Sequence, residues 1–459
     1  MSSTATVTLT TASQVRLSKS NLDNYPVPKD LAGSLEAANR LLQRNHDSHH
    51  IFWRDLNGHN HMAHSLLSIL ALGGSPADIQ RAYDDGLAVQ RPLPKLDPGI
   101  VDELADDGKF YARLGQIDQY SNFLVFFEQE IEKHGWQAVI NQYVFGRTKL
   151  ADAVLARLYE GAYHPIIHLG LGIEFEQPSI VAEGLAQAAT HSSSRATELF
   201  EMCEREAEKI NPTEPSPPLI DLLNRARENN VLRTAARWED FANKFKDGVV
   251  GRGGAELAPL AAKFRVRPEE VERRCAEMVN CVAYISGAAQ RADKVPKIDF
   301  FHMHAVTSSI FLTVMIRQPW ISIADKSRLV EWKGRLDIAW YVASGCGKLH
   351  QAAIYEYEGQ PSGQMDWEAL YRAINAMHDD GHVAKFVRAL KSGEETSRPF
   401  EHGPGAEAFP IKGEEAWLKL ARMTYDSTLE VPVEQKWVWG TGFDQAWGAV
   451  PNKAAELTN

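Results

Sequence analysis

The chain has 459 residues, of which 44% are hydrophobic, so it can bury a sizeable core in one large domain or in two to three ordinary ones. Its formal net charge is −11 and it contains no basic block, which argues against nucleic-acid binding. The N-terminal segment is polar and no run of about 18 apolar residues occurs, so we expect no secretory signal, no membrane span and a cytoplasmic protein.

The four cysteines are too widely spaced to indicate a metal-binding pair or a disulfide framework. We therefore expect free thiols in a reducing compartment. These residues are Cys203, Cys275, Cys281 and Cys346.

The helical spacing of apolar residues predicts an all-α fold, without alternating strands and without a repeat of 20–50 residues. We expect a flexible segment at residues 1–27 and a single helical domain over 28–459, with the Pro-rich stretch 211–218 as an internal loop break. The helices predicted before this break are Pro28–Gln43, Gly58–Leu72, Pro76–Tyr83, Val101–Arg113, Ser121–Lys133, Trp136–Val144, Lys149–Tyr159, a helix with Pro165 in its first turn, Pro178–Ala189 and Glu198–Ile210. Those predicted after it are Leu219–Glu228, Trp238–Phe245, Ala255–Phe264, Pro268–Ala289, Phe300–Met315, Lys326–Ser344, Trp367–Met377, Gly381–Lys391 and Glu414–Thr424.

Two predicted helices near the N-terminal end are apolar on nearly every face and carry histidines. The segment GHNHMAHSLLSILALGG contains His61 and His64, which lie three residues apart and share one face. In YHPIIHLGLGIEFEQP the proline suits the first helical turn, which places His164 near the N-cap and His168 one turn further along the same side. Buried imidazoles need polar partners, so both segments are candidates for a shared site.

A third helix of this kind is FFHMHAVTSSIFLTVM. His302 and His304 are separated by about 200° around its axis, so both cannot face the same site. Thr307 and Ser308 follow in the direction of His304. We therefore interpret His304 as functional and His302 as structural.

The last candidate segment is DDGHVAKFVRALKSG, in which His382 and Lys385 lie one turn apart on the edge of an apolar stripe. Taken alone, Lys385 is typical of a solvent-exposed flank. A lysine beside a metal requires a neutral or carbamylated amine, because an ammonium group has no lone pair to donate.

Each histidine inside an apolar helix is typical of a core residue when taken singly, but together they favour a shared metal or polar pocket. The cluster NHDSHH, with His46, His49 and His50, precedes no predicted rigid element, and we expect it to be a solvent-exposed loop. No HExxH, P-loop, GxSxG or Rossmann GxGxxG motif occurs, so the sequence gives no support for the sites that these motifs build.

Four segments together resemble the questin oxidase-like family, fungal enzymes that open the ring of anthraquinone-type compounds in aromatic polyketide pathways. They are HNHMAHSLLSILALGGSPADIQRAYD, YHPIIHLGLGIEFEQP, DFFHMHAVTSSIF and DGHVAKFVRAL, in this order between residues 59 and 390. The resemblance implies a largely helical single-domain oxygenase that acts on a small aromatic polyketide and O2. Its chemistry would be Baeyer–Villiger oxidation or dioxygenase cleavage.

The resemblance also implies a set of site residues, because some relatives hold non-haem iron with four histidines and a carbamylated lysine. The corresponding residues here are one of His61 and His64, together with His168, His304, His382 and Lys385. Within the first pair we assign His64 to the metal and His61 as the catalytic base. Thr307 matches a polar position that orients the substrate or a peroxide.

Non-haem Fe(II) is the preferred cofactor, because the predicted buried imidazoles outnumber what a single base requires. Cofactor-free reaction of a substrate anion with O2 stays open, as does NADPH, which has been attributed to the family. Two other functions also stay open: a non-enzymatic helical carrier of an aromatic pigment, and a metal-dependent hydrolase with Glu174 as its main acidic candidate.

Overall fold

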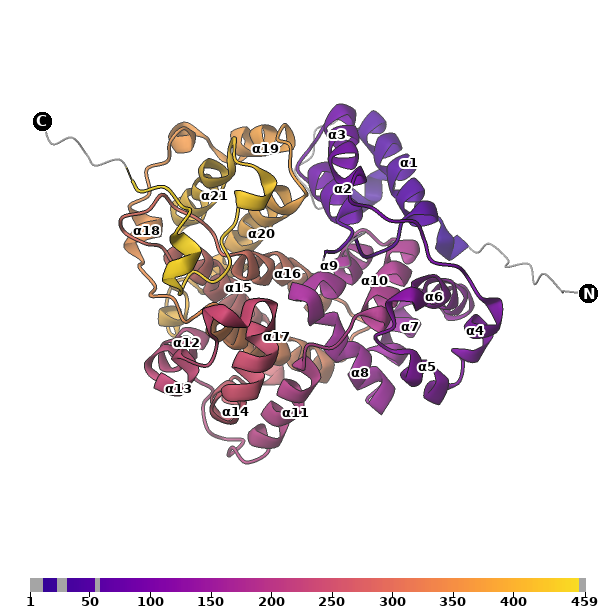
Figure 1. Ribbon diagram of the computed structural model, residues 1–459, viewed down its shortest axis with the longest axis horizontal. Coiled ribbons are helices and arrows are strands. Elements are labelled where there is room, and N and C mark those ends of the chain that lie inside the picture. Colours follow the sequence, from indigo (N-terminus) through magenta and orange to yellow (C-terminus); the bar gives the residue numbers. More distant parts are fainter. Residues whose placement is uncertain (1–10, 23–30, 54–57, 454–459) are drawn as a thin grey trace, which may run out of the picture. The chain divides into compact units, whose positions relative to one another are not determined.

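The computed structural model describes residues 11–22, 31–53 and 58–453, and the regular elements within these ranges are helices (Figure 1). Isolated bridges occur, such as the one between Phe52 and His59, but the described residues form no strand. The predicted all-α fold is confirmed. Within the same ranges, no helix combines the length and the apolar composition that crossing a bilayer requires.

The chain divides into two compact units, each assembled from three stretches of sequence. Unit 1 comprises Met1–Thr197, Arg317–Ser322 and Tyr371–Lys385, and unit 2 comprises Glu198–Ile316, Ile323–Leu370 and Phe386–Asn459. Three of the passages from one unit to the other lie within helices, α11 (Ala196–Ala207), α19 (Trp367–Asn375) and α20 (His382–Ser397). The predicted loop break at 211–218 is a helix-free connection inside unit 2.

Unit 1 is built around α10 (Pro178–Thr190), which is buried from its second residue to its last. It packs against α6 (Tyr120–His134), α8 (Lys149–Leu158) and α9 (Glu160–Glu174). A second group of helices, α1 (Ala32–Ser48), α2 (Met62–Ala71) and α3 (Pro76–Leu87), pack on one another, and α2 also contacts α9. The remaining helices of unit 1 are α4 (Pro98–Glu103), α5 (Asp107–Arg113) and α7 (Trp136–Tyr143).

A glycine allows the close approach of α9 and α10. A Cβ atom at Gly184 would lie 2.6 Å from the backbone of Leu169, a separation that real Cβ atoms essentially never show. Neighbouring residues of the two helices are thereby brought into contact, among them His168 of α9 and Glu183 of α10.

Unit 2 has a core of three helices that contact one another, α15 (Val271–Ala288), α16 (Phe300–Ile316) and α17 (Ile323–Ala343). Nearly all residues of α16 are buried, as its continuous apolar sequence predicts. The other α-helices of this unit are α12 (Leu219–Glu228), α13 (Asn230–Arg233), α14 (Gly254–Ala261), α18 (Ala352–Tyr355) and α21 (Glu414–Thr428).

Three predicted elements differ from the structure. Helix α1 runs on to Ser48 and His46 is buried, so the predicted exposed loop NHDSHH is wrong; its buried imidazole finds carboxylate partners on α6 and α10. The helix predicted over 101–113 is two helices, because the Asp106 side chain accepts a hydrogen bond from Lys109 N and starts a new one. The α-helix predicted over 238–245 is instead a 3₁₀-helix, Trp238–Asn243, broken by a positive φ at Phe241 and followed by a π-helix, Lys244–Arg252.

Part of the N-terminal segment predicted to be flexible contacts α1. The backbone N–H groups of Val15 and Leu17 donate to the side chains of Gln43 and Asn39. The other residues of that segment, 1–10 and 23–27, lie outside the described ranges.

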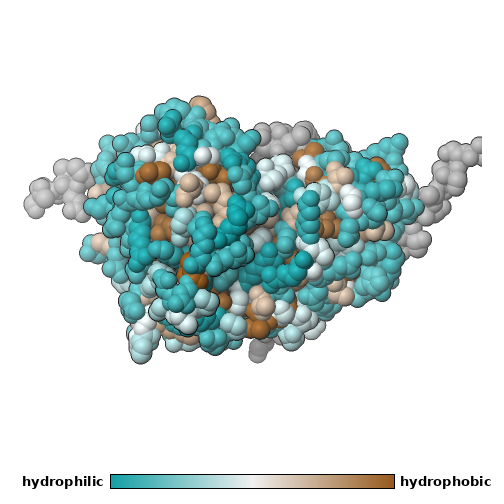
Figure 2. All heavy atoms as spheres, turned by 90° about the horizontal axis from the view of Figure 1, so that it is seen from below, coloured by the Kyte–Doolittle hydropathy of each residue, from teal (hydrophilic) through white to brown (hydrophobic). Residues whose placement is uncertain are grey.

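The four cysteines are buried and free, as predicted. Figure 2 shows one face of the molecule, which is mainly hydrophilic with small, scattered hydrophobic patches. Scattered patches of this kind are ordinary on a protein surface.

Candidate active site

Histidines from α2, α9 and α20 meet in the interior of unit 1. His61 is the N-cap of α2, His164 is the first residue of α9 after a backbone kink, and His382 begins α20. Each of these buried side chains offers a ring nitrogen, and the nitrogens lie within 4.8 Å of one another. Three imidazole nitrogens at this spacing suit a divalent transition metal.

In each of these three histidine rings, one nitrogen lies within hydrogen-bond distance of an oxygen atom. His61 Nδ1 lies 3.0 Å from the backbone carbonyl oxygen of Asp380, and His382 Nδ1 lies 2.6 Å from the carboxylate of the same residue. His164 Nδ1 lies 2.5 Å from the carbonyl oxygen of Gly161. Because carbonyl and carboxylate oxygens only accept, each Nδ1 carries its hydrogen and each Nε2 keeps a lone pair.

The lone pairs of two rings face one another, since Nε2 of His61 lies 2.8 Å from Nε2 of His164. Such a contact is repulsive unless a cation or an additional proton lies with the two nitrogens. Histidine ligands of metals commonly have their second nitrogen held in this way by an oxygen acceptor. The three residues therefore fit a non-haem metal.

The backbone before His164 has an unusual conformation. Gly161, Ala162 and Tyr163 have φ values of 54°, 52° and 66°, in the left-handed region. This region costs a non-glycine residue about 1–2 kcal/mol, and such strain is concentrated at functional sites. A Cβ at Gly161 would lie 2.3 Å from His191 Nε2, so the position requires glycine on two grounds.

A partly open pocket of about 260 Å³ lies next to this kink. His59 and His191 line it, with their Nε2 atoms 3.0 Å apart. The His59 ring also stacks on that of His164, with centroids 4.0 Å apart. A row of stacked imidazoles thus connects the pocket to the buried histidines.

Lys385 is buried in the same unit, only 4% exposed, so the view of it as a solvent-exposed flank is wrong. Its Nζ has no hydrogen-bond partner among the described residues. Burial lowers the pKa of Lys385 to about 7, against the opposing charges of Asp380 and Asp379. A substantial share of the amine is therefore neutral near pH 7, the form that carbamylation requires.

His64 and His168 form a second buried pair. His64 Nε2 lies 3.2 Å from His168 Nδ1, and the His64 ring lies beside those of His61 and His164, with centroids 5.6 and 5.9 Å away. Burial, together with the positive charge of Lys385, lowers the pKa of His64 and keeps it neutral. Its Nδ1 is buried without a hydrogen-bond partner in the described part of the chain.

Unit 1 thus brings together five of the predicted site residues: His61, His64, His168, His382 and Lys385. The other two, His304 and Thr307, lie on α16 in unit 2, and their roles stay predictions. His304 Nδ1 lies 2.7 Å from the Phe300 carbonyl oxygen, and the Thr307 hydroxyl donates to the His304 carbonyl. His302 is buried, and neither of its ring nitrogens has a hydrogen-bond partner among the described residues.

Sequence reasoning did not assign His164 or Asp380 to the site. The spacing of His164 and His168, four residues apart on a buried helix, was the available signal for the first. The role of Asp380 has a weaker signal, a carboxylate two residues before His382. Its carbonyl serves His61 across 319 residues of sequence, which no local pattern can show.

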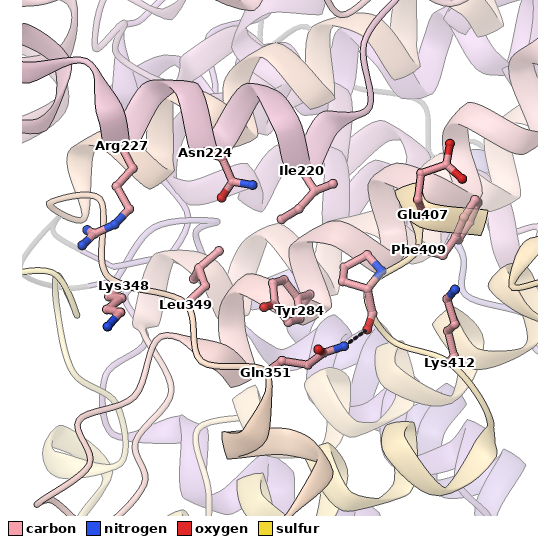
Figure 3. A pocket seen from close by; sticks show the side chains of 11 residues that line it. Ile220, Asn224, Arg227, Tyr284, Lys348, Leu349, Gln351, Glu407, Phe409 and Lys412 are labelled. Atoms are coloured by element: carbon pink, nitrogen blue, oxygen red, sulfur yellow. Dashed lines mark hydrogen bonds between the residues drawn. The ribbon is translucent and has the colours of Figure 1, made fainter. Parts of the chain in front are cut away.

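Unit 2 has another partly open pocket, of about 370 Å³ (Figure 3). Arg227, Lys348 and Lys412 give its lining a basic character, and Tyr284 lies at its centre in this view. None of the described residues that line it is a histidine, so it lacks the imidazoles of the site in unit 1.

Comparison with known proteins identifies the family. The model of the questin oxidase-like family matches residues 58–390, which is most of the chain. This chain belongs to the questin oxidase-like family. Its relatives include the Baeyer-Villiger oxidase ptaJ of Pestalotiopsis fici, 54% identical over 442 residues that cover 96% of this chain and 99% of the relative. The questin oxidases of Aspergillus terreus and Aspergillus fumigatus are 51% and 49% identical, over 98% and 96% of this chain and 100% of each relative.

The resemblance found in the sequence is thereby confirmed. As a member of the questin oxidase-like family with near full-length relatives that are named oxidases, the chain is an oxidoreductase acting on a small molecule. The names of the relatives give no support to a pigment carrier or to a hydrolase.

Proposed function

We propose that this chain opens the ring of an anthraquinone, or of its hydroquinone, with O2 in fungal aromatic polyketide biosynthesis. The names of the relatives support this proposal, since questin is an anthraquinone and Baeyer–Villiger oxidation inserts oxygen beside a ring carbonyl. The substrate class is therefore a planar phenolic polycycle that carries a ring carbonyl.

We assign non-haem Fe(II) to His61, His164 and His382. The observation that carries this assignment is the convergence of three buried imidazole nitrogens whose tautomers are set by Asp380 and Gly161. When bound, ferrous iron supplies the single electrons that triplet O2 needs to react with a closed-shell aromatic compound. This assignment exchanges the roles of His61 and His64, since we expected His64 to bind the metal and His61 to act as the base.

Other residues of the chain would prepare the substrate. His64 is neutral and its Nδ1 is unpartnered among the described residues, so this nitrogen can accept the proton of a phenolic hydroxyl group. The resulting phenolate is richer in electrons and easier to oxidise. Lys385, converted to a carbamate by CO2, would add a carboxylate donor to the imidazoles.

The proposal is tested by incubating the purified enzyme with a trihydroxyanthraquinone hydroquinone under ¹⁸O2, while iron is measured in the same preparation. We expect a ring-opened product that contains ¹⁸O, and loss of both iron and activity in His382→Gln. The matched control is His134→Gln, because His134 is an exposed histidine of the same unit. Full turnover by rigorously metal-free protein would contradict the iron assignment, and absence of any ring-opened product would contradict the proposed function.

The form in which the substrate is supplied distinguishes two roles of NADPH, as a reductant of the substrate and as a co-substrate of the enzyme. If NADPH only keeps the substrate reduced, a chemically reduced hydroquinone reacts without it. Consumption of NADPH in a fixed ratio to product from that same hydroquinone would instead show that the enzyme uses it as a co-substrate.

A further inference from the structure

A chain of buried hydrogen bonds leads from the candidate site to α6. His64 Nε2 lies 3.2 Å from His168 Nδ1, and His168 Nε2 lies 2.6 Å from one oxygen of Glu183. The other oxygen of Glu183 lies 2.6 Å from His46 Nδ1, and His46 Nε2 lies 2.9 Å from Glu128. All five residues are less than 10% exposed, so these contacts form away from solvent.

Glu183 is ionised in this chain and His46 is its counter-ion. Burial acts against both charges, but the hydrogen bonds to His168 and His46 lower the pKa of Glu183 to about 2. In the same way, Glu128 and Glu183 outweigh burial and raise the pKa of His46 to about 10. Both nitrogens of His46 therefore carry hydrogen, and Glu183 has only acceptor sites to offer.

The acceptor at Glu183 sets the direction of the following hydrogen bonds. Because a carboxylate can only accept, His168 Nε2 carries hydrogen, and a ring with its single hydrogen at this position presents a lone pair at Nδ1. That lone pair accepts from His64 Nε2, which leaves His64 Nδ1 without hydrogen.

The packing of two helices keeps the donor, His168, and the acceptor, Glu183, in place. His168 and Glu183 lie on α9 and α10, whose approach depends on the missing Cβ of Gly184 against the backbone of Leu169. Glu183 is next to that contact in the sequence. The carboxylate therefore has little freedom to leave the imidazole.

We propose that Glu183 is a positioning residue for the oxidation, because it fixes the tautomer of His168 and, through His168, makes His64 Nδ1 an acceptor for the substrate hydroxyl. The inference rests on the proposed function only in naming a phenolic hydroxyl group of the substrate as the donor to His64 Nδ1. His46 has the supporting role of holding Glu183 ionised and oriented.

The test reads the tautomers directly, by long-range ¹H–¹⁵N correlation on the full chain labelled with [¹⁵N]histidine and purified without added metal. The signals of His64 and His168 are assigned from the spectra of His64→Gln and His168→Gln. In the wild type we expect hydrogen on Nε2 and none on Nδ1 in both rings. A wild-type spectrum with His168 doubly protonated, or with hydrogen on His64 Nδ1, would overturn the proposal whether or not any variant folds.

Substitution of Glu183 supplies the functional arm. Glu183→Gln offers His168 either an amide oxygen or an amide N–H, so we expect a mixture of tautomers at both rings. We expect a fall in kcat of about 10–100-fold, the range typical of the partners that orient metal-ligating histidines. KM should change little, because Glu183 does not touch the substrate. Glu128→Gln removes a carboxylate of the same cluster without touching His168, so the His168 tautomer should persist.

An unchanged His168 tautomer in folded Glu183→Gln would overturn the proposal. A loss of kcat equal in the two variants, with tautomers kept in both, would also overturn it, since a merely structural role would give that result. If the protein does not open anthraquinone rings, no variant shows activity, but the tautomers can still be measured. Failure of the proposed function can therefore be distinguished from failure of the proposed role of Glu183.

Discussion

At the scale of single residues, Asp380 has the widest influence on the histidine group, because its carboxylate and its carbonyl each orient one ring. Asp380→Ala removes only the carboxylate. We expect His382 to lose its fixed tautomer and the metal affinity to fall by about 10–100-fold. Iron retained after dialysis against a graded series of chelator concentrations measures this change.

The matched control for that substitution is Asp85→Ala. Asp85 accepts from Nδ1 of an exposed histidine, His378, at 2.8 Å in the same unit. Equal loss of iron in both variants would show that Asp380 has no special role at the site.

Lys385 permits a prediction in which stability and function move in opposite directions. A buried amine without a hydrogen-bond partner costs about 1–3 kcal/mol, and methionine has a similar length and no charge. Lys385→Met should therefore raise the free energy of unfolding at pH 7 while it lowers iron content and turnover. Urea unfolding and metal analysis measure the two effects, with Lys95→Met as the exposed control. A variant that retains full iron and activity would remove Lys385 from the site.

At the scale of elements, the left-handed kink at the start of α9 makes opposite predictions for adjacent residues. Gly161→Ala places a Cβ 2.3 Å from His191 Nε2 at a φ of 54°, so we expect a lower Tm and displacement of the carbonyl that orients His164. Ala162→Gly should relieve strain at a φ of 52° and stabilise the protein by up to about 1 kcal/mol. Thermal unfolding measures both variants, and each serves as the control for the other. A Gly161→Ala variant as stable as wild type would show that the kink is not strained.

Local sequence patterns predicted most helices because the period of apolar residues records which face is buried. Helix α12 has the predicted bounds, and α16 is one residue longer than predicted. His46 escaped prediction because its partners, Glu128 and Glu183, lie 82 and 137 residues away. The same reason applies to the site: the sequence identified the buried histidines of unit 1, but their tautomers depend on oxygens from distant segments.

At the scale of the whole molecule, the charges buried in unit 1 predict how stability depends on pH. The pKa of His46 is about 10 in the folded protein, where Glu128 and Glu183 outweigh the effect of burial, against an ordinary value of 6.5 in the unfolded chain. Between these values the folded state binds one proton more than the unfolded state. The stabilisation from this residue is therefore complete below pH 6.5 and is lost as the pH rises towards 10, at about 1.4 kcal/mol per pH unit.

His46→Gln isolates this contribution. It leaves two buried carboxylates without their cation, so we expect the variant to be less stable than wild type by about 3–5 kcal/mol near neutral pH. The difference in the free energy of unfolding should shrink as the pH rises from 6.5 to 9, because the wild type loses a stabilisation that the variant never had. Urea unfolding across this range measures the difference, and His134→Gln, at an exposed site of the same unit, should show no such trend. A difference that stays constant with pH would mean that His46 is not charged in the folded protein, and Glu183 would then lack the counter-ion that keeps it an acceptor for His168.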